Sequence, residues 1–252
     1  MSAACGEDAV TLLPREVRLV VERILLLTRL PPGAIPAVRD VVLYSAAAGL
    51  GGLSLLRRRF ESLRDAEPVA LRITEARPGG LCIDAGGQHS WVALPATLDA
   101  LAEAAGREGV AVATVTGVGD PEELRAACAL GPRSGLTVFF TEGGCTGPAT
   151  RANAALLRAA GGPTLIAAPG ASGRDAVLEH ALRRGTVVEP ELWWALHHLS
   201  NTALAADTPE SRRHAGPVIV EADGRITGRS DHDDDTDISL LTAAKPDAHN
   251  AH

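Results

Sequence analysis

Residues 108–141 read EGVAVATVTGVGDPEELRAACALGPRSGLTVFFT. The run at 110–115 is apolar and rich in Val, which predicts a buried strand. Asp120 precedes a helical pattern at 121–129, and an Asp N-cap followed by Pro is typical of a helix start. The run at 136–141 predicts a second strand, apolar enough to be buried on both faces. A strand, a helix and a strand in this order predict an α/β fold.

The same alternation continues on both sides of this stretch. Helices are expected at 14–30, 36–48, 53–63, 96–107, 149–160, 174–184 and 190–205, and strands at 69–74, 81–84 and 164–168. Residues 218–227 are expected to form a hairpin. We therefore expect an N-terminal helical subdomain at 1–65, an α/β core at 66–229 and an acidic disordered tail at 230–252. The core is expected to be a mixed, mostly parallel sheet with covering helices.

The charge is distributed unevenly along the chain. The formal net charge is −7, and residues 230–252 hold six Asp against one Lys, a net charge of −5. The rest of the chain is nearly neutral, so we expect no nucleic-acid partner, because nucleic-acid binding needs a basic face. The run DHDDDTD at 231–237 lacks the glycine and the final Glu of a calcium loop, so we expect no metal there.

The cysteine spacing and the apolar runs allow a prediction of the cellular compartment. The four cysteines have no CxxC spacing, and the first residues, MSAACGEDAV, lack the basic start and apolar run of a secretory leader. The most apolar stretch, at 17–30, is interrupted by Arg and Glu and is too short to span a bilayer. We therefore expect a cytoplasmic protein with reduced thiols and no membrane partner.

Several blocks of sequence resemble one enzyme family when they are taken in order. They are GGLSLLRRR at 51–59, CIDAGGQ at 82–88, EGVAVATV at 108–115, Ala171-Ser172, Arg184-Gly185, Pro190, Trp194 and Asp207-Thr208-Pro209. In this order they are similar to the malate/L-lactate dehydrogenase-like (LDH2/MDH2) family of oxidoreductases, which is distinct from the Rossmann dehydrogenases. The resemblance covers roughly residues 12–209.

The resemblance implies a homodimeric enzyme that uses NAD(P) to reduce 2-keto acids or cyclic imino acids. It also places Ser54 and Arg59 at the substrate and Ser172 near the cofactor. The chain departs from the family pattern where Leu55 replaces the family's histidine and where residues 117–120 replace its Asn-x-x-His. The family's C-terminal part is also expected to be missing. Reduction of a carbonyl or imine needs a proton donor, so another residue must supply it.

The segment TEGGCTGP at 141–148 is one candidate site. It follows a predicted strand and precedes a predicted helix, which is where open α/β sheets place ligands. Its acidic and thiol groups, Glu142 and Cys145, are candidate acid–base or nucleophilic residues. The candidate cofactor-binding residues are Gly143, Gly144, Thr146 and Ser172. The other interpretation is a glycine-rich turn with a half-buried cysteine.

A second candidate site lies in the glycine-rich turn after the strand at 81–84. Its polar side chains are Asp84 and Gln88, which we assign to substrate binding, and His89, which is a candidate catalytic proton donor. Asp120 is a further candidate acid or base. The alternative is that His89 lies in an ordinary surface turn. His197 and His198 are adjacent and cannot both face one metal from a helix, so no metal site is expected there.

Three functions remain open at this point. The chain is expected to be a small-molecule enzyme related to NAD(P)H-dependent reductases, with NAD(P) implied by the resemblance. The alternatives are a non-redox isomerase or cyclase on the same fold, and a non-catalytic helper protein. Convergence of His89 and Cys145 in one pocket would favour an enzyme.

Overall fold

The computed structural model describes residues 9–142, 162–170, 175–204, 218–220 and 226–228. The chain divides into two compact units, Met1–Ala203 and Leu204–His252. The second unit contains an antiparallel pair of strands, β8 (Val218–Val220) and β9 (Ile226–Gly228), which confirms the predicted hairpin. The features below all belong to the first unit.

Three helices form the N-terminal part: α1 (Pro14–Leu25), α2 (Ile35–Ala47) and α3 (Gly52–Arg64). In α1 the apolar positions at helical spacing are buried, and the Glu16 carboxylate accepts a hydrogen bond from the Leu13 N–H at 2.7 Å. The helix ends at Leu25, earlier than the expected 30, where Thr28 Oγ1 donates to the Leu25 carbonyl. Helix α2 is buried on most sides and is the centre of the helical layer.

The α2–α3 contact depends on one glycine. A Cβ atom on Gly52 would lie 2.3 Å from the Val42 carbonyl oxygen and 2.6 Å from the Ala46 nitrogen. Only glycine therefore lets the first turn of α3 approach the α2 backbone this closely.

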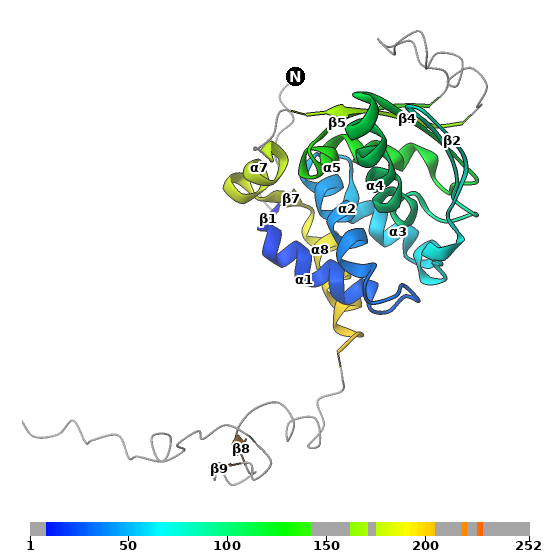
Figure 1. Ribbon diagram of the computed structural model, residues 1–252. Coiled ribbons are helices and arrows are strands. Elements are labelled where there is room, and N and C mark those ends of the chain that lie inside the picture. Colours follow the sequence, from blue (N-terminus) through cyan, green and yellow to red (C-terminus); the bar gives the residue numbers. More distant parts are fainter. Residues whose placement is uncertain (1–8, 143–161, 171–174, 205–217, 221–225, 229–252) are drawn as a thin grey trace, which may run out of the picture. The chain divides into compact units, whose positions relative to one another are not determined.

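The main sheet has five strands in the order β2-β3-β4-β6-β5. They are β2 (Arg72–Arg77), β3 (Gly80–Asp84), β4 (Ala111–Thr116), β5 (Leu136–Thr141) and β6 (Thr164–Pro169). Figure 1 shows α4 (Ser90–Glu108) and α5 (Ala126–Leu130) beside this sheet, with α2 next to them. The predicted α/β class is confirmed, and the sheet is mixed.

The expectation of a mostly parallel sheet was wrong. Only β3 and β4 pair in parallel, and the other three pairs are antiparallel. Strands β4 and β5 do run in the same direction, as the strand–helix–strand unit predicts. However, β6 is inserted between them and runs antiparallel to both. The edge position of β5 also overturns its expected burial on both faces, because Phe139 is 61% exposed there.

Other element boundaries also differ from expectation, and two of them do so for reasons in the nearby residues. Helix α4 begins at Ser90 rather than at 96, because the His89 side chain caps it by accepting from the Trp91 N–H. The expected helix at 121–129 divides into a 3-10 turn, η2 (Pro121–Arg125), and the short helix α5. The residue before η2, Asp120, does not cap it with its side chain.

The remaining elements complete one core. Strand β1 (Val10–Leu12) pairs antiparallel with β7 (Thr186–Val188). In the sequence, β7 lies between α7 (Ala176–Arg184) and α8 (Pro190–Asn201). The buried apolar side chains of the N-terminal helices and of the helices beside the sheet form a single cluster. The division expected at residue 65 stays a prediction. Among the described residues, no helix is both long and apolar enough to span a membrane.

Candidate functional site

The candidate site lies where the parallel strands β3 and β4 end. The two turns that follow these strands run side by side and are joined by hydrogen bonds. Gly87 N donates to Gly117 O at 2.7 Å, Gly119 N to Gln88 O at 2.8 Å, and Ser90 N to Gly119 O at 3.0 Å. This edge, at the carboxyl ends of parallel strands, is the usual position of ligand sites in α/β proteins.

Four side chains meet at this edge, and we call them the acid–base cluster: Arg59, His89, Asp120 and Glu123. Arg59 comes from α3, His89 from the turn after β3, and the two acids from the segment after β4. Arg59 Nη2 lies 2.6 Å from Asp120 Oδ1, and Arg59 Nε lies 3.5 Å from Glu123 Oε1. His89 Nε2 lies 3.3 Å from Glu123 Oε2 and 3.5 Å from Asp120 Oδ2. Three of the residues predicted from the sequence therefore converge.

The cluster has a buried side and an exposed side. The side chains of His89 and Glu123 are 1% and 2% exposed, whereas those of Asp120 and Arg59 are 21% and 35% exposed. A molecule arriving from solvent would therefore meet the Asp120 carboxylate and the Arg59 guanidinium first. His89 and Glu123 lie behind them.

The contacts of His89 fix its tautomer. Its Nδ1 accepts a hydrogen bond from the Trp91 backbone N–H at 3.1 Å, so Nδ1 has no proton. The ring N–H is then on Nε2, which faces Glu123 and Asp120. Neither ring nitrogen faces solvent. His89 can therefore act on a substrate only through the neighbouring carboxylates.

The backbone at Asp120 is unusual. Asp120 has φ 52° and ψ 59° and is the only non-glycine residue with positive φ in the described part of the chain. Asp tolerates this left-handed region better than most residues do. Ser90 Oγ donates to the Asp120 carbonyl at 2.5 Å and helps to hold the turn. Such conformations often occur at functional sites.

Glu123 was not predicted from the sequence. Its position in PEELR suggests an ordinary solvated face of a helix, yet both of its carboxylate oxygens are buried and have no hydrogen-bond partner. His89 Nε2 and Arg59 Nε are also buried without a well-formed hydrogen bond. Buried charged groups without good partners are costly and need an explanation.

The acidic residues of this segment have the spacing of a metal site. One oxygen each from Asp120, Glu122 and Glu123 lies within 4.8 Å of the others. However, the Arg59 guanidinium already contacts this set, with Nη2 at 4.0 Å from Glu122 Oε1 in addition to the contacts above. The His89 N–H points toward two of the carboxylates, which disfavours a cation between them. We therefore assign the neutralising cation of this group to Arg59.

The side chains of Asp84 and Gln88 stabilise turns by accepting backbone hydrogen bonds and are not part of the acid–base cluster. Asp84 Oδ1 accepts from Gly86 N at 2.9 Å, and Gln88 Oε1 accepts from Glu67 N at 2.6 Å. A Cβ atom on Gly117 would lie 2.5 Å from Asp84 Oδ1, so a glycine is needed opposite this carboxylate. Neither residue has a contact with the cluster among the described interactions.

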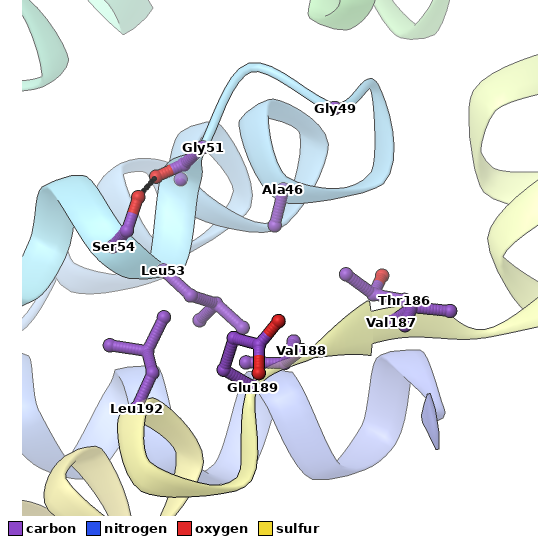
Figure 2. Close-up of a pocket in the computed structure, with 11 residues that line it drawn as sticks. Ala46, Gly49, Gly51, Leu53, Ser54, Thr186, Val187, Val188, Glu189 and Leu192 are labelled. Atoms are coloured by element: carbon purple, nitrogen blue, oxygen red, sulfur yellow. Dashed lines mark hydrogen bonds between the residues drawn. The ribbon is translucent and has the colours of Figure 1, made fainter. Parts of the chain in front are cut away.

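Ser54 lies in a different pocket, drawn in Figure 2. This pocket encloses about 300 Å³ between the first turn of α3 and the β7–α8 connection, and its walls include Leu53, Val188, Glu189 and Leu192. Ser54 Oγ donates to the Gly51 carbonyl at 2.9 Å. No residue of the acid–base cluster lines this pocket.

Glu142 directly follows β5 and is exposed. The other residues predicted at this end of the strand, Gly143, Gly144, Cys145 and Thr146, lie outside the described residues, as does Ser172. The convergence of His89 with Cys145 therefore stays a prediction.

The glycine-rich turn beside the cluster does not fit the phosphates of a dinucleotide. A phosphate cradle needs free backbone N–H groups. The N–H groups of Ala85, Gly86, Gly87, Gln88 and Ser90 all donate within the protein. The neighbouring carboxylates would also repel a phosphate. Any dinucleotide contact must therefore come from other parts of the chain.

Comparison with known proteins identifies solved structures that have a similar fold. No protein-family model and no curated protein matches the sequence. A putative malate/lactate dehydrogenase from E. coli is similar in structure, with a TM-score of 0.52 and 10% identity over 79% of this chain and 96% of that one. A dehydrogenase from Sinorhizobium meliloti gives a TM-score of 0.52 and 12% identity over 77% of this chain and 100% of that one.

A malate dehydrogenase from Entamoeba histolytica gives a TM-score of 0.42 and 12% identity over 53% of this chain. The chain spans only 38% of the length of that enzyme. The two structures with a TM-score of 0.52 show that the chain shares the fold of malate/lactate dehydrogenase-like proteins, as the sequence resemblance predicts.

Proposed function

We propose that this chain is an enzyme that transfers a proton on a small organic substrate, with Asp120 as the acid–base group. One observation supports this most strongly. A partly exposed carboxylate, in a strained turn at the end of parallel strands, is held by Arg59 in front and by a buried His–Glu pair behind. Acid–base catalysis needs such a positioned group within reach of the substrate.

Each residue of the cluster has a distinct part in this proposal. Arg59 binds Asp120 Oδ1 and fixes the direction of the carboxylate. Asp120 Oδ2 is then directed to the His89 N–H, which stabilises negative charge on that oxygen. Proton transfer to or from a substrate takes place on the exposed edge of Asp120. His89 and Glu123 are positioning residues, because they reach the substrate only through Asp120.

The proposed substrates are small 2-keto acids or cyclic imino acids. The dehydrogenase-like fold and the sequence resemblance support this class, and Arg59 offers a guanidinium to a substrate carboxylate. NADH or NADPH as hydride donor is part of the proposal through the fold and the resemblance only. We derive no step through it, because the turn beside the cluster does not fit its phosphates. A homodimer and a cytoplasmic location are proposed on the resemblance and the cysteine pattern.

A non-redox proton transfer, such as an isomerisation, is the second candidate. The bonded amides of the turn at 85–90 favour it, because they leave no phosphate cradle beside the cluster. An isomerisation needs one group that removes a proton from carbon and returns it to another atom. Asp120 is sufficient for that step, and no cofactor is needed.

A titration with NADH and NADPH separates the two candidates. Unfolding temperature and cofactor fluorescence are measured over a range of concentrations. Specific binding raises the free energy of unfolding by about 2.7 kcal/mol at a hundredfold excess over Kd. A saturable shift with one cofactor supports the reductase. No shift with either at millimolar concentration removes the hydride reaction and leaves the isomerisation.

A further inference from the structure

We infer that two copies of this chain associate through the face of the main sheet that lies away from its helices, over strands β4, β6 and β5. The inference rests on the homodimer of the proposed function and gives that homodimer a location, but it does not depend on the proposed chemistry. It follows from the alternation of side chains in these strands, from their lack of charge and from the match between two rows of side chains.

The main sheet has the hydrophobic core on one side only in the described part of the chain. Val138 of β5 and Ala167 of β6 belong to the core cluster. Their neighbours Phe139 and Ile166 do not, and Val112 of β4 is buried without belonging to the cluster. Because successive side chains of a strand point to opposite faces, these last three residues lie on the other face, which we call the open face. Figure 1 shows α2, α4 and α5 together on the core side.

The open face has no charge where these three strands form it. Strands β4, β5 and β6 contain no charged residue, whereas β2 at the opposite edge of the sheet has Arg72, Glu75 and Arg77. Sheet surfaces in water usually have charged side chains, which prevent association with other chains. Two copies of net charge −7 repel each other, so a surface without charge is where they can approach most closely.

Two neighbouring rows of side chains cross the three strands on the open face, about 7 Å apart. The apolar row is Val112, Ile166 and Phe139, and the threonine row is Thr114, Thr164 and Thr141. The exposed fraction of the apolar row increases toward the edge of the sheet, because Val112 is 2% exposed, Ile166 is half-buried and Phe139 is 61% exposed. The apolar row therefore ends on an aromatic side chain in water.

A second copy of the chain fits these two rows. A two-fold axis that runs parallel to the rows and between them places the apolar row of each copy on the threonine row of the other. The two rows have the same length, so the same surface serves both copies. Sheets that pack face to face interdigitate their side chains in this way. Phe139 would then be enclosed by the threonine row of the second copy.

The oligomeric state of the full chain tests the inference. Sedimentation equilibrium and light scattering are measured from micromolar to millimolar concentration. The contact covers only three short strands, so we expect a dissociation constant on the order of 1–100 µM. Raised salt should strengthen the association, because it screens the repulsion between two negatively charged copies. An interface held by ion pairs would weaken instead.

Variants assign the dimer to the open face. Phe139→Lys places a charge at the exposed end of the apolar row and should weaken the dimer at least about tenfold. Thr137→Lys, at another exposed position on the same face of β5, should have the same effect if the first variant does not fold.

Ile73→Lys is the matched control, because Ile73 is 56% exposed at the opposite edge of the sheet and pairs with Ile83 of the core cluster, on the other face. It should leave the dissociation constant unchanged. Urea unfolding checks that each variant is folded.

Fluorine NMR checks the location directly in the natural chain. The three phenylalanines are Phe60, Phe139 and Phe140, and fluorinated phenylalanine labels all of them. The resonance that is lost in Phe139→Lys belongs to Phe139. It should shift as the protein concentration is raised, whereas the resonance of Phe60, which packs against the core cluster, should not.

A dimer that Phe139→Lys and Thr137→Lys leave intact would keep the homodimer and overturn its location. A monomer at every concentration would overturn both, and would mean that another segment of the chain or a different partner covers the open face. Neither result bears on proton transfer at Asp120.

Discussion

The Nε2 atom of His89 lies 3.3 Å from the Oε2 atom of Glu123, and both side chains are almost completely enclosed. This pair joins the start of α4 to the segment after β4, and Arg59 joins the same pair to α3. The pair therefore connects three parts of the fold at the point where the candidate site is built. Its removal should affect stability and chemistry in different ways.

Substitution of His89 should destabilise the fold more when the cap of α4 is lost than when it is kept. His89→Ala removes the cap of α4 and the buried imidazole that lies against Glu123, and we expect a loss of about 2–4 kcal/mol in the free energy of unfolding. His89→Asn keeps a capping acceptor and should lose about 1 kcal/mol less. Urea unfolding of both variants checks this, and equal losses would contradict the capping role.

Substitution of Glu123 should separate stability from function. Glu123→Gln replaces a buried carboxyl group that has no hydrogen bond, while Arg59 keeps its contact with Asp120. We expect the free energy of unfolding to rise or to change by less than about 1 kcal/mol, together with slower proton transfer. A large loss of stability in urea would mean that Glu123 is mainly structural.

Alanine substitutions at two glycines test the close packing of α2 against α3. Gly52→Ala places a methyl group 2.3 Å from the Val42 carbonyl oxygen, and overpacking of this kind costs about 1–3 kcal/mol or more. Gly33→Ala is the matched control, because nothing lies within 4 Å of its added carbon. Thermal unfolding should show a clear loss for the first variant only. Equal melting temperatures would disprove the close approach.

Ionisation of Tyr44 should lower the free energy of unfolding at alkaline pH. Burial, and then its hydrogen bond to Asp175, raise the pKa of Tyr44 above its ordinary value. Because the folded pKa is higher than the unfolded one, the stabilisation is complete below about pH 10 and is lost as pH rises above it. The loss is up to about 1.4 kcal/mol per pH unit.

Tyr44→Phe removes this titration, so its stability relative to the natural chain should improve above about pH 10. Tyr44 is the only tyrosine, so tyrosinate absorbance follows its ionisation directly. An ordinary tyrosine titration in the folded protein would contradict the buried hydrogen bond.

The sequence predicted the type of most elements because their signals are local. Helical spacing in α1 and the apolar runs of β4 and β5 depend only on nearby residues. Strand order depends on contacts far apart in the chain, and nothing local shows that β6 inserts between β4 and β5. The start of α4 was missed because its cap is a histidine, which is not one of the usual capping residues.

The dependence on contacts far apart in the chain also explains how much of the candidate site could be predicted. Arg59, His89 and Asp120 were chosen on separate grounds, by resemblance, by position after a strand and by position before a helix. Their convergence is a property of the fold. Glu123 was missed because PEELR has the composition of an exposed helix, and its burial follows from the short 3-10 turn η2. The orientation of His89 could not be predicted, because a backbone N–H determines it.

The central claim is that Asp120 transfers a proton on a small substrate, and its most direct test is NMR in heavy water. The natural chain and Asp120→Asn are incubated with a panel of 2-keto acids and cyclic imines, with and without NADH or NADPH, so that reduction and carbon-bound hydrogen exchange are both recorded. Asn tolerates the left-handed backbone at this position, so the variant should fold. We predict that the natural chain converts or exchanges at least one compound, and that Asp120→Asn does so at least about a hundredfold more slowly. Equal rates for the two proteins, or no change in any compound, would contradict the account.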